Sequence, residues 1–184
     1  MIKQRGFTLI ELLVVLVIIS LLVSMAVINT NYDPRPDELK QEGTRIKFFL
    51  EAVTDEAVFK DKNLGLLFTP SQILVFSREY GQDPNSQEDK KIPLWVEFNG
   101  RFAKPFPESE YQEKTFDLSI NGKPILLSNN YEKDKQPKPQ LIIRSTGEQQ
   151  VAHIGISYPD FDLKQTVRGN GTGRYFLEEL NDEF

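Results

Sequence analysis

The sequence predicts an α+β fold in which a long N-terminal helix precedes a domain of antiparallel strands. An almost uninterrupted apolar run covers residues 7–28, and an apolar stripe at helical spacing continues to about Lys60. After Asp61 the pattern changes to short runs of alternating apolar and polar residues that are separated by turns. Strands that follow one long helix in this way are typical of an α+β domain with one antiparallel sheet or two small sheets.

The apolar run from Phe7 to Ile28 is long enough to cross a membrane. Its 22 residues rise about 33 Å as a helix, against roughly 30 Å for a hydrocarbon core. Lys3 and Arg5 precede the run, so the positive-inside rule places the N-terminus in the cytoplasm and the later residues outside it. We therefore expect a leader over residues 1–6 and a single transmembrane helix over residues 7–30.

Two other kinds of segment compete with this interpretation. A secretory signal peptide has a shorter apolar region that ends in a small-x-small cleavage site, and no Ala-x-Ala follows this run. A generic single-pass anchor explains the length but not Glu11. A carboxylate at the centre of a membrane helix costs on the order of 3 kcal/mol, and somewhat less near its end, so such a group usually has a partner.

Cleavage after Gly6 provides a partner for this carboxylate. It exposes the α-amine of Phe7, four residues before Glu11, and an α-amine with a pKa of about 8 is mostly cationic at neutral pH. An ammonium and a carboxylate that are each costly in lipid become tolerable as a pair. If the amine belongs to a neighbouring subunit, the pair also sets the axial register of a helical array.

The hexapeptide from Gly6 to Glu11 resembles the processing site of type IV pilins and of type II secretion pseudopilins. The resemblance implies that a prepilin peptidase cuts between Gly6 and Phe7 and N-methylates Phe7. It implies that Glu11 guides assembly. It also implies a type IV pilin-like fold, in which a long helix with a membrane half and an amphipathic half packs on antiparallel β-sheet.

Residues 31–60 are predicted to form the amphipathic half of the helix. Asp33 is suited to cap a helix, and Pro34 and Pro36 fit a first turn, where backbone N–H groups lack partners. Pilins usually keep a more continuous helix, so the prolines leave open one kinked helix or two helices in tandem. We expect one face of this segment to pack on the domain's own sheet. That face carries Leu39, Ile46, Phe49, Leu50, Val53 and Ala57.

Residues 61–184 are predicted to form a β-rich domain. A hairpin turn is expected at Asn121–Gly122, and the turn at residues 145–148 is expected to pair the strands on either side of it. The polar segments 81–91 and 129–139 are predicted to be long exposed loops, which either contact partner subunits or serve only as connectors. The expected strands are 64–69, 72–77, 94–98, 115–120, 124–127, 141–144, 151–158, 163–168 and 174–177.

Three regions of the chain resemble the H-type minor pseudopilins of type II secretion. They are Lys138–Glu148, Leu50–Val58 with the following Asn63–Leu66, and Gly169–Arg174, while residues 81–135 match only loosely. The resemblance implies a subunit near the tip of a periplasmic pseudopilus, between other minor pseudopilins and the major pseudopilin. It implies assembly at an inner-membrane secretion platform, with the N-terminus cytoplasmic and the C-terminal domain periplasmic. Such a filament helps to export folded exoproteins through the outer-membrane secretin.

Composition and motifs favour a structural role without a cofactor over catalysis. The chain has no cysteine, and it lacks the usual nucleophile, zinc and phosphate-loop motifs. The single histidine, His153, is expected at the surface of a strand rather than as a general base. No metal site is predicted, because the acidic run at residues 83–89 lacks the spacing of a calcium loop. Its candidate oxygen donors are Asp83, Asn85, Glu88 and Asp89.

Charge argues against nucleic-acid binding. The formal net charge is −5, and removal of the leader with Lys3 and Arg5 makes it more negative. The segment from Arg174 to Phe184 carries one arginine among several acids, so it repels phosphates. The alternative function is a minor pilin of a type IV pilus, with a role in assembly or DNA uptake.

Overall fold

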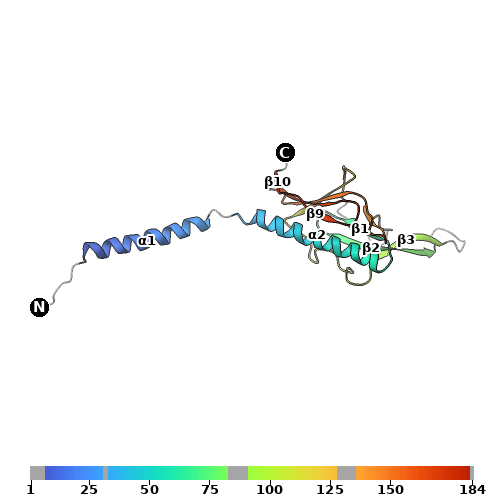
Figure 1. Cartoon of the computed structure of the whole chain (residues 1–184), viewed down its shortest axis with the longest axis horizontal. Coiled ribbons are helices and arrows are strands. Elements are labelled where there is room, and N and C mark those ends of the chain that lie inside the picture. Colours follow the sequence, from blue (N-terminus) through green and yellow to red (C-terminus); the bar gives the residue numbers. More distant parts are fainter. Residues whose placement is uncertain (1–6, 31–32, 83–90, 128–135, 183–184) are drawn as a thin grey trace. The chain divides into compact units, whose positions relative to one another are not determined.

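The computed structural model describes residues 7–30, 33–82, 91–127 and 136–182. The chain divides into two compact units, Met1–Arg35 and Pro36–Phe184 (Figure 1). The first unit is mainly one helix, and the second contains a helix and the strands.

The helix of the first unit is α1, Leu9–Thr30. It begins after Thr8, whose side chain and backbone make the capping contacts described below. The hydroxyl of Ser20 donates to the carbonyl oxygen of Leu16 one turn earlier, as expected for a small hydroxyl on an apolar helix. Among the residues that the structure describes, no helix combines the length and the apolar character needed to cross a membrane.

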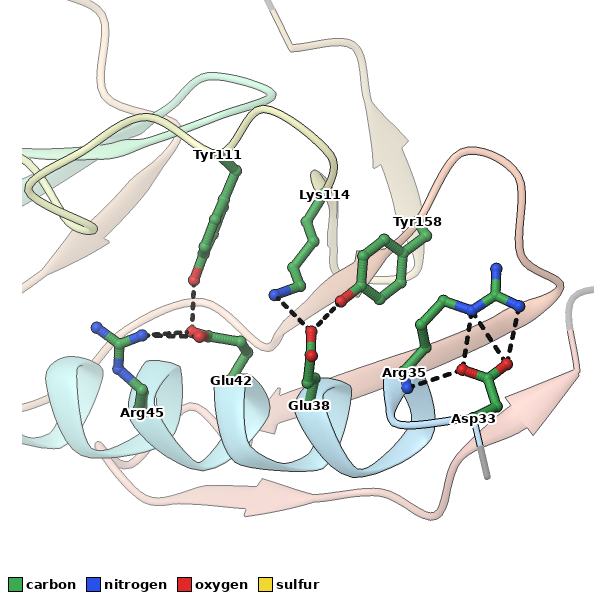
Figure 2. Close-up of polar contacts among 8 residues, drawn as sticks. All are labelled: Asp33, Arg35, Glu38, Glu42, Arg45, Tyr111, Lys114 and Tyr158. Carbon is green, nitrogen blue, oxygen red and sulfur yellow. Dashed lines mark hydrogen bonds and ion pairs between the residues drawn. The ribbon is translucent and has the colours of Figure 1, made fainter. Parts of the chain in front are cut away.

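A second helix, α2, runs from Arg35 to Phe59, so the structure contains two helices in tandem rather than one. It begins four residues later than the predicted amphipathic segment. The carboxylate of Asp33 accepts a hydrogen bond from the backbone N–H of Arg35 at 3.0 Å, which confirms Asp33 as a cap. The same carboxylate pairs with the Arg35 guanidinium at 2.8 Å (Figure 2).

The predicted stripe of α2 faces the core. Leu39, Ile46, Leu50, Val53 and Ala57 are fully buried, and Phe49 is partly buried against the same cluster. Gly43, which the pattern did not single out, also lies on this face. A Cβ atom at position 43 would lie 2.4 Å from Cγ of Gln165 and 2.9 Å from Cδ2 of Leu177. Glycine at this position therefore lets the helix pack closely against the side chains of β8 and β9.

The strands form two antiparallel sheets, which confirms the two-sheet alternative. The first sheet has the order β3–β2–β1–β6, and the second has the order β10–β8–β7–β4–β5, with β9 paired to β8. The strands are β1 Leu64–Phe68, β2 Ile73–Gln82, β3 Lys91–Glu97, β4 Thr115–Ile120, β5 Lys123–Ile125, β6 Leu141–Ile143, β7 Ala152–Ser157, β8 Leu163–Gly169, β9 Tyr175–Leu177 and β10 Asn181–Asp182.

The core of the second unit joins α2 to both sheets. Buried side chains from β1, β2 and β6 of the first sheet and from β4, β7 and β8 of the second belong to one cluster with the apolar face of α2. Figure 1 shows α2 lying alongside the strands of this unit. Burial of this contiguous apolar surface is the main source of stability for the fold.

One predicted strand pairing is wrong. The turn after β6 forms, with the Arg144 N–H donating to the Glu148 carbonyl at 2.8 Å, but β6 lies in the first sheet and β7 in the second. Only an isolated bridge joins Ile143 to Gln149. The N–H of Ile142 bonds instead to the side-chain oxygen of Gln150 at 3.1 Å. A side chain therefore closes the edge of β6, and the chain crosses to the other sheet.

The first of the two polar segments, residues 81–91, is shorter as a loop than predicted, whereas residues 136–139 of the second lie outside helices and strands, as predicted. Gly81 and Gln82 belong to β2 and Lys91 to β3, since cross-strand pairing continues to the pair Gln82–Lys91. Residues 83–90 of this segment, and residues 129–135 of the other, lie outside the described residues. The hairpin turn between β4 and β5 is confirmed, with φ values of 51° at Asn121 and 75° at Gly122.

Candidate processing and assembly site

The first turn of α1 places Thr8 and Glu11 in reciprocal contact. The backbone N–H and the hydroxyl of Thr8 both donate to Oε2 of Glu11, at 2.9 Å and 3.0 Å. The backbone N–H of Glu11 approaches the Thr8 hydroxyl oxygen at 3.3 Å. This is the geometry of a capping box, in which an N-cap threonine and a glutamate three residues later satisfy each other's backbone donors.

The capping box aims the Glu11 carboxylate at the N-terminal end of the helix. Glu11 lines one shallow hollow of about 350 Å³ together with Phe7 and three aliphatic side chains, Ile10, Val14 and Val15. The sequence interpretation singled out Glu11 and Phe7 but overlooked Thr8. The signal for Thr8 was present, because Thr-x-x-Glu before an apolar run is a capping signature.

The side chains of α1 form an uncovered apolar surface. Every large apolar side chain described between Phe7 and Met25 is at least 45% exposed. Large exposed apolar surfaces mark sites of contact with other protein or with a membrane. Gly6, the predicted residue before the cleavage point, lies outside the described residues.

In the second unit, two carboxylates near the start of α2 hold neighbouring segments (Figure 2). The Tyr111 hydroxyl donates to Glu42 Oε2 at 2.6 Å, and the Arg45 guanidinium donates to Oε1 of the same carboxylate at 2.7 Å. Burial, and next the hydrogen bond to Glu42, raises the pKa of Tyr111 above the ordinary value for a phenol. Tyr111 therefore stays protonated, and it fastens the loop before β4 to the helix.

Glu38 holds a second segment one turn earlier on the same helix. Its carboxylate accepts a hydrogen bond from the Tyr158 hydroxyl and lies 3.4 Å from Nζ of Lys114. Burial, followed by the hydrogen bond to Glu38, raises the pKa of Tyr158. Together the two glutamates tie the segment before β4 and the segment after β7, which meet at the same end of the second sheet, to α2. Their hydrogen bonds position these segments on the helix.

His153 lies at the surface of β7, as predicted. Ala152, Ile154 and Ile156 face the core, and His153 is half-buried on the other face. Its Nε2 atom is 4.0 Å from Glu178 Oε1, which also lies 3.6 Å from Nε of Arg168. Within the described ranges, no three histidine, aspartate or glutamate side chains gather as metal ligands. Asp83, Asn85, Glu88 and Asp89 lie outside those ranges.

Comparison with known families matches the N-terminal segment. Residues 1–27 match the prokaryotic N-terminal methylation motif. The match includes both sides of the predicted cleavage point and the capping box of α1.

Comparison with known proteins extends the match over most of the chain. The sequence is 32% identical over 152 residues to type II secretion system protein H of Pseudomonas aeruginosa. The matched region covers 79% of this chain and 78% of that protein. Two structures of the minor pseudopilin EpsH from the type 2 secretion system of Vibrio cholerae superpose with TM-scores of 0.57 and 0.53, at 17% and 16% identity. They cover 80% and 77% of this chain and 97% and 96% of their own chains. GspH of E. coli superposes with a TM-score of 0.51 at 15% identity, covering 84% of this chain and 95% of that chain.

Proposed function

This chain belongs to the family of type II secretion system protein H, and from that premise we propose that it is a minor pseudopilin that assembles into a periplasmic pseudopilus. The observation that carries the proposal is the similarity to protein H, which covers 79% of this chain and 78% of that protein. The pseudopilin fold of the second unit supports it.

The N-terminal segment has the features expected of a processing site. In the proposed maturation, a prepilin peptidase cleaves between Gly6 and Phe7 and methylates the new α-amine of Phe7. The match to the N-terminal methylation motif supports this step. Glu11 then acts as the assembly carboxylate, because its capping contacts hold it toward the end of the helix where the amine is created.

The proposed location is the inner membrane, with residues 1–6 in the cytoplasm and the second unit in the periplasm. The apolar sequence from Phe7 to Ile28 supports a single membrane anchor over residues 7–30, and Lys3 and Arg5 support the orientation. The exposed apolar surface of α1 is consistent with cover by lipid before assembly and by other subunits after it.

The proposed role is structural rather than catalytic. The subunit would lie near the filament tip and contact other minor pseudopilins and the major pseudopilin. Prepilin peptidase and the inner-membrane platform are the proposed partners in maturation and assembly. The filament would then help to export folded exoproteins through the secretin.

A clean deletion in the source organism tests this function. Exoproteins are measured in the culture supernatant and periplasm, and twitching and transformation are scored in the same strain. The proposal expects exoproteins to be retained in the periplasm while pilus functions stay normal. Normal secretion with lost motility or DNA uptake would instead assign the chain to a type IV pilus.

A further inference from the structure

Four residues far apart in sequence form one row across the outer face of the first sheet. Arg78 of β2 is the cross-strand partner of Trp95 of β3. The N–H of Arg78 donates to the carbonyl of Asn63 at 3.0 Å, just before β1 begins. On the other side, β6 ends beside this point, since Leu64 pairs with Ile143. Arg144 therefore completes the row Trp95–Arg78–Asn63–Arg144.

All four side chains of this row face away from the core. Leu64, Ser77 and Ile143, the neighbours of row members in their strands, are buried. Because successive side chains alternate between the two faces of a sheet, the row must lie on the opposite face. Arg78 and Arg144 are accordingly exposed. They are two strand spacings apart, roughly 10 Å.

The row is held in place by the strands beneath it. The Trp95 ring lies over Gly65, where a Cβ atom would be 2.8 Å from Cζ3 of the indole. The Arg78 guanidinium carbon is 5.8 Å from the Trp95 ring centroid, a cation–π distance. Asn63 is fixed at the other side, because its Oδ1 accepts a hydrogen bond from the Ser145 N–H at 3.0 Å. The aromatic ring and the central amide are therefore positioned in advance.

A groove of about 450 Å³ runs past Asn63, Arg78 and Arg144. Its other walls come from β6 and from the turn around Gly171 and Thr172. Glu148 also lines the groove, 3.4 Å from the Arg144 guanidinium, and both side chains of that pair are about two-thirds exposed. An exposed ion pair of this length contributes little, so a better-placed carboxylate can displace Glu148 from Arg144.

We propose that this arginine groove binds an acidic, extended segment of a partner protein. A carboxylate of the segment would accept paired hydrogen bonds from a guanidinium, which is the geometry that arginine favours. An extended strand presents alternate side chains about 7 Å apart on one face, so two carboxylates can reach both arginines. An adjacent apolar side chain would pack on the Trp95 ring.

The observations favour a protein segment over a nucleic acid. A nucleic-acid backbone needs an extended basic surface, whereas this groove holds two arginines and one glutamate in a chain of formal net charge −5. The proposal depends only on the geometry of the second unit, so its failure would leave the secretion function untouched.

Trp95 reports on the groove through Arg78, whose guanidinium lies 5.8 Å from its ring centroid, and it is the only tryptophan in the chain. The full-length protein in detergent micelles is titrated with an acetylated, amidated peptide of alternating glutamate and leucine. Trp95 fluorescence is followed together with the anisotropy of a neutral dye on the peptide. A peptide with glutamine in place of glutamate and a single-stranded oligothymidine are titrated in parallel.

We expect saturable binding of the glutamate peptide that weakens with added salt, and no binding of the glutamine peptide. Arg78→Gln and Arg144→Gln should each weaken binding about tenfold, because each removes a charge-assisted pair. Arg101→Gln is the matched control, since Arg101 is exposed and contacts Phe102 outside the groove.

Three results would overturn the proposal. One is the absence of both a fluorescence and an anisotropy change with folded protein. The second is equal weakening by Arg101→Gln, which would indicate non-specific attraction. The third is tighter binding of the oligothymidine, which would assign the groove to nucleic acid.

Discussion

The Glu11 carboxylate accepts a hydrogen bond from the backbone N–H of Thr8 at 2.9 Å, while the Thr8 hydroxyl oxygen lies 3.3 Å from the Glu11 N–H. Glu11 thus has two possible uses. As an acceptor it caps α1, and as a charge it can pair with the amine that cleavage creates at Phe7. The two uses are separable, because a side-chain amide can accept the capping hydrogen bond but cannot supply the negative charge.

Glu11→Gln tests which use matters for assembly. The glutamine side-chain oxygen can still accept from Thr8, but its charge is lost. We expect Glu11→Gln and Glu11→Ala to remain in the membrane fraction and both to lose co-purification with the other pseudopilins. If Glu11→Gln co-purifies like the wild type while Glu11→Ala does not, capping is sufficient and the charge-pair argument is wrong.

Gly6→Val is expected to block maturation. A side chain at the residue before the cleaved bond should clash with a peptidase site and turn that accept only glycine. Mass spectrometry of the purified protein should therefore show an intact leader and no methyl group on Phe7. Gln4→Val adds a similar side chain two residues away and should be processed normally. A fully processed Gly6→Val protein would contradict the predicted cleavage point.

Gly173→Ala is expected to destabilise the second unit more than Gly122→Ala. The two glycines have φ values of 79° and 75°, so both substitutions incur the left-handed strain of about 1 kcal/mol. Only at position 173 does a Cβ atom also meet Thr54 Cγ2 at 2.8 Å and the Gly147 carbonyl oxygen at 2.9 Å. Such overpacking adds about 2 kcal/mol. Urea unfolding monitored by Trp95 fluorescence gives the free energy of unfolding of each variant. Equal losses of this free energy would show that the close contacts of a Cβ atom at position 173 are relieved without cost.

Tyr175 is expected to make the folded state sensitive to alkali. Burial raises its pKa to about 12, whereas an unfolded phenol has a pKa of about 10. A raised pKa means that the folded state favours the protonated form. The raised pKa of Tyr175 therefore stabilises the folded state by about 3 kcal/mol below about pH 10, and this stabilisation is lost as the pH rises to about 12.

Tyr175→Phe tests this contribution. At neutral pH the variant should be less stable by about 1 kcal/mol. It lacks the hydroxyl that donates to the Gln149 side chain and lies 3.3 Å from the Thr54 hydroxyl in the wild type. Between about pH 10 and 12 its urea midpoint should fall less steeply than that of the wild type. Tyr80→Phe, at a position 75% exposed, serves as the control and should follow the wild-type curve. Parallel curves for all three proteins would rule out a role for Tyr175.

Much of the fold follows from local sequence patterns. The apolar stripe of α2, the strand segments and the turn at Asn121–Gly122 were predictable, because the period of apolar residues and the φ preference of turn residues are properties of a few neighbouring positions. The same holds for Gly6, Phe7 and Glu11, which stand in one hexapeptide, and their roles in processing and assembly stay predictions. Thr8 was within reach of the same reasoning, through its spacing to Glu11.

Tertiary structure alone decided which strands are neighbours. Alternation in β6 and β7 predicted that each strand buries one face, but it carries no information about the partner along the hydrogen-bonded edge. The pairing of β6 with β1 in the first sheet brought Arg144 beside Asn63, in the same row as Arg78 and Trp95. The bond from Tyr111 to Glu42 likewise joins residues 69 positions apart. The sequence by itself determined the elements, the buried face of each and the processing motif, because these depend on short-range spacing. The arginine groove and the contacts to α2 depend on long-range packing, which no local pattern encodes.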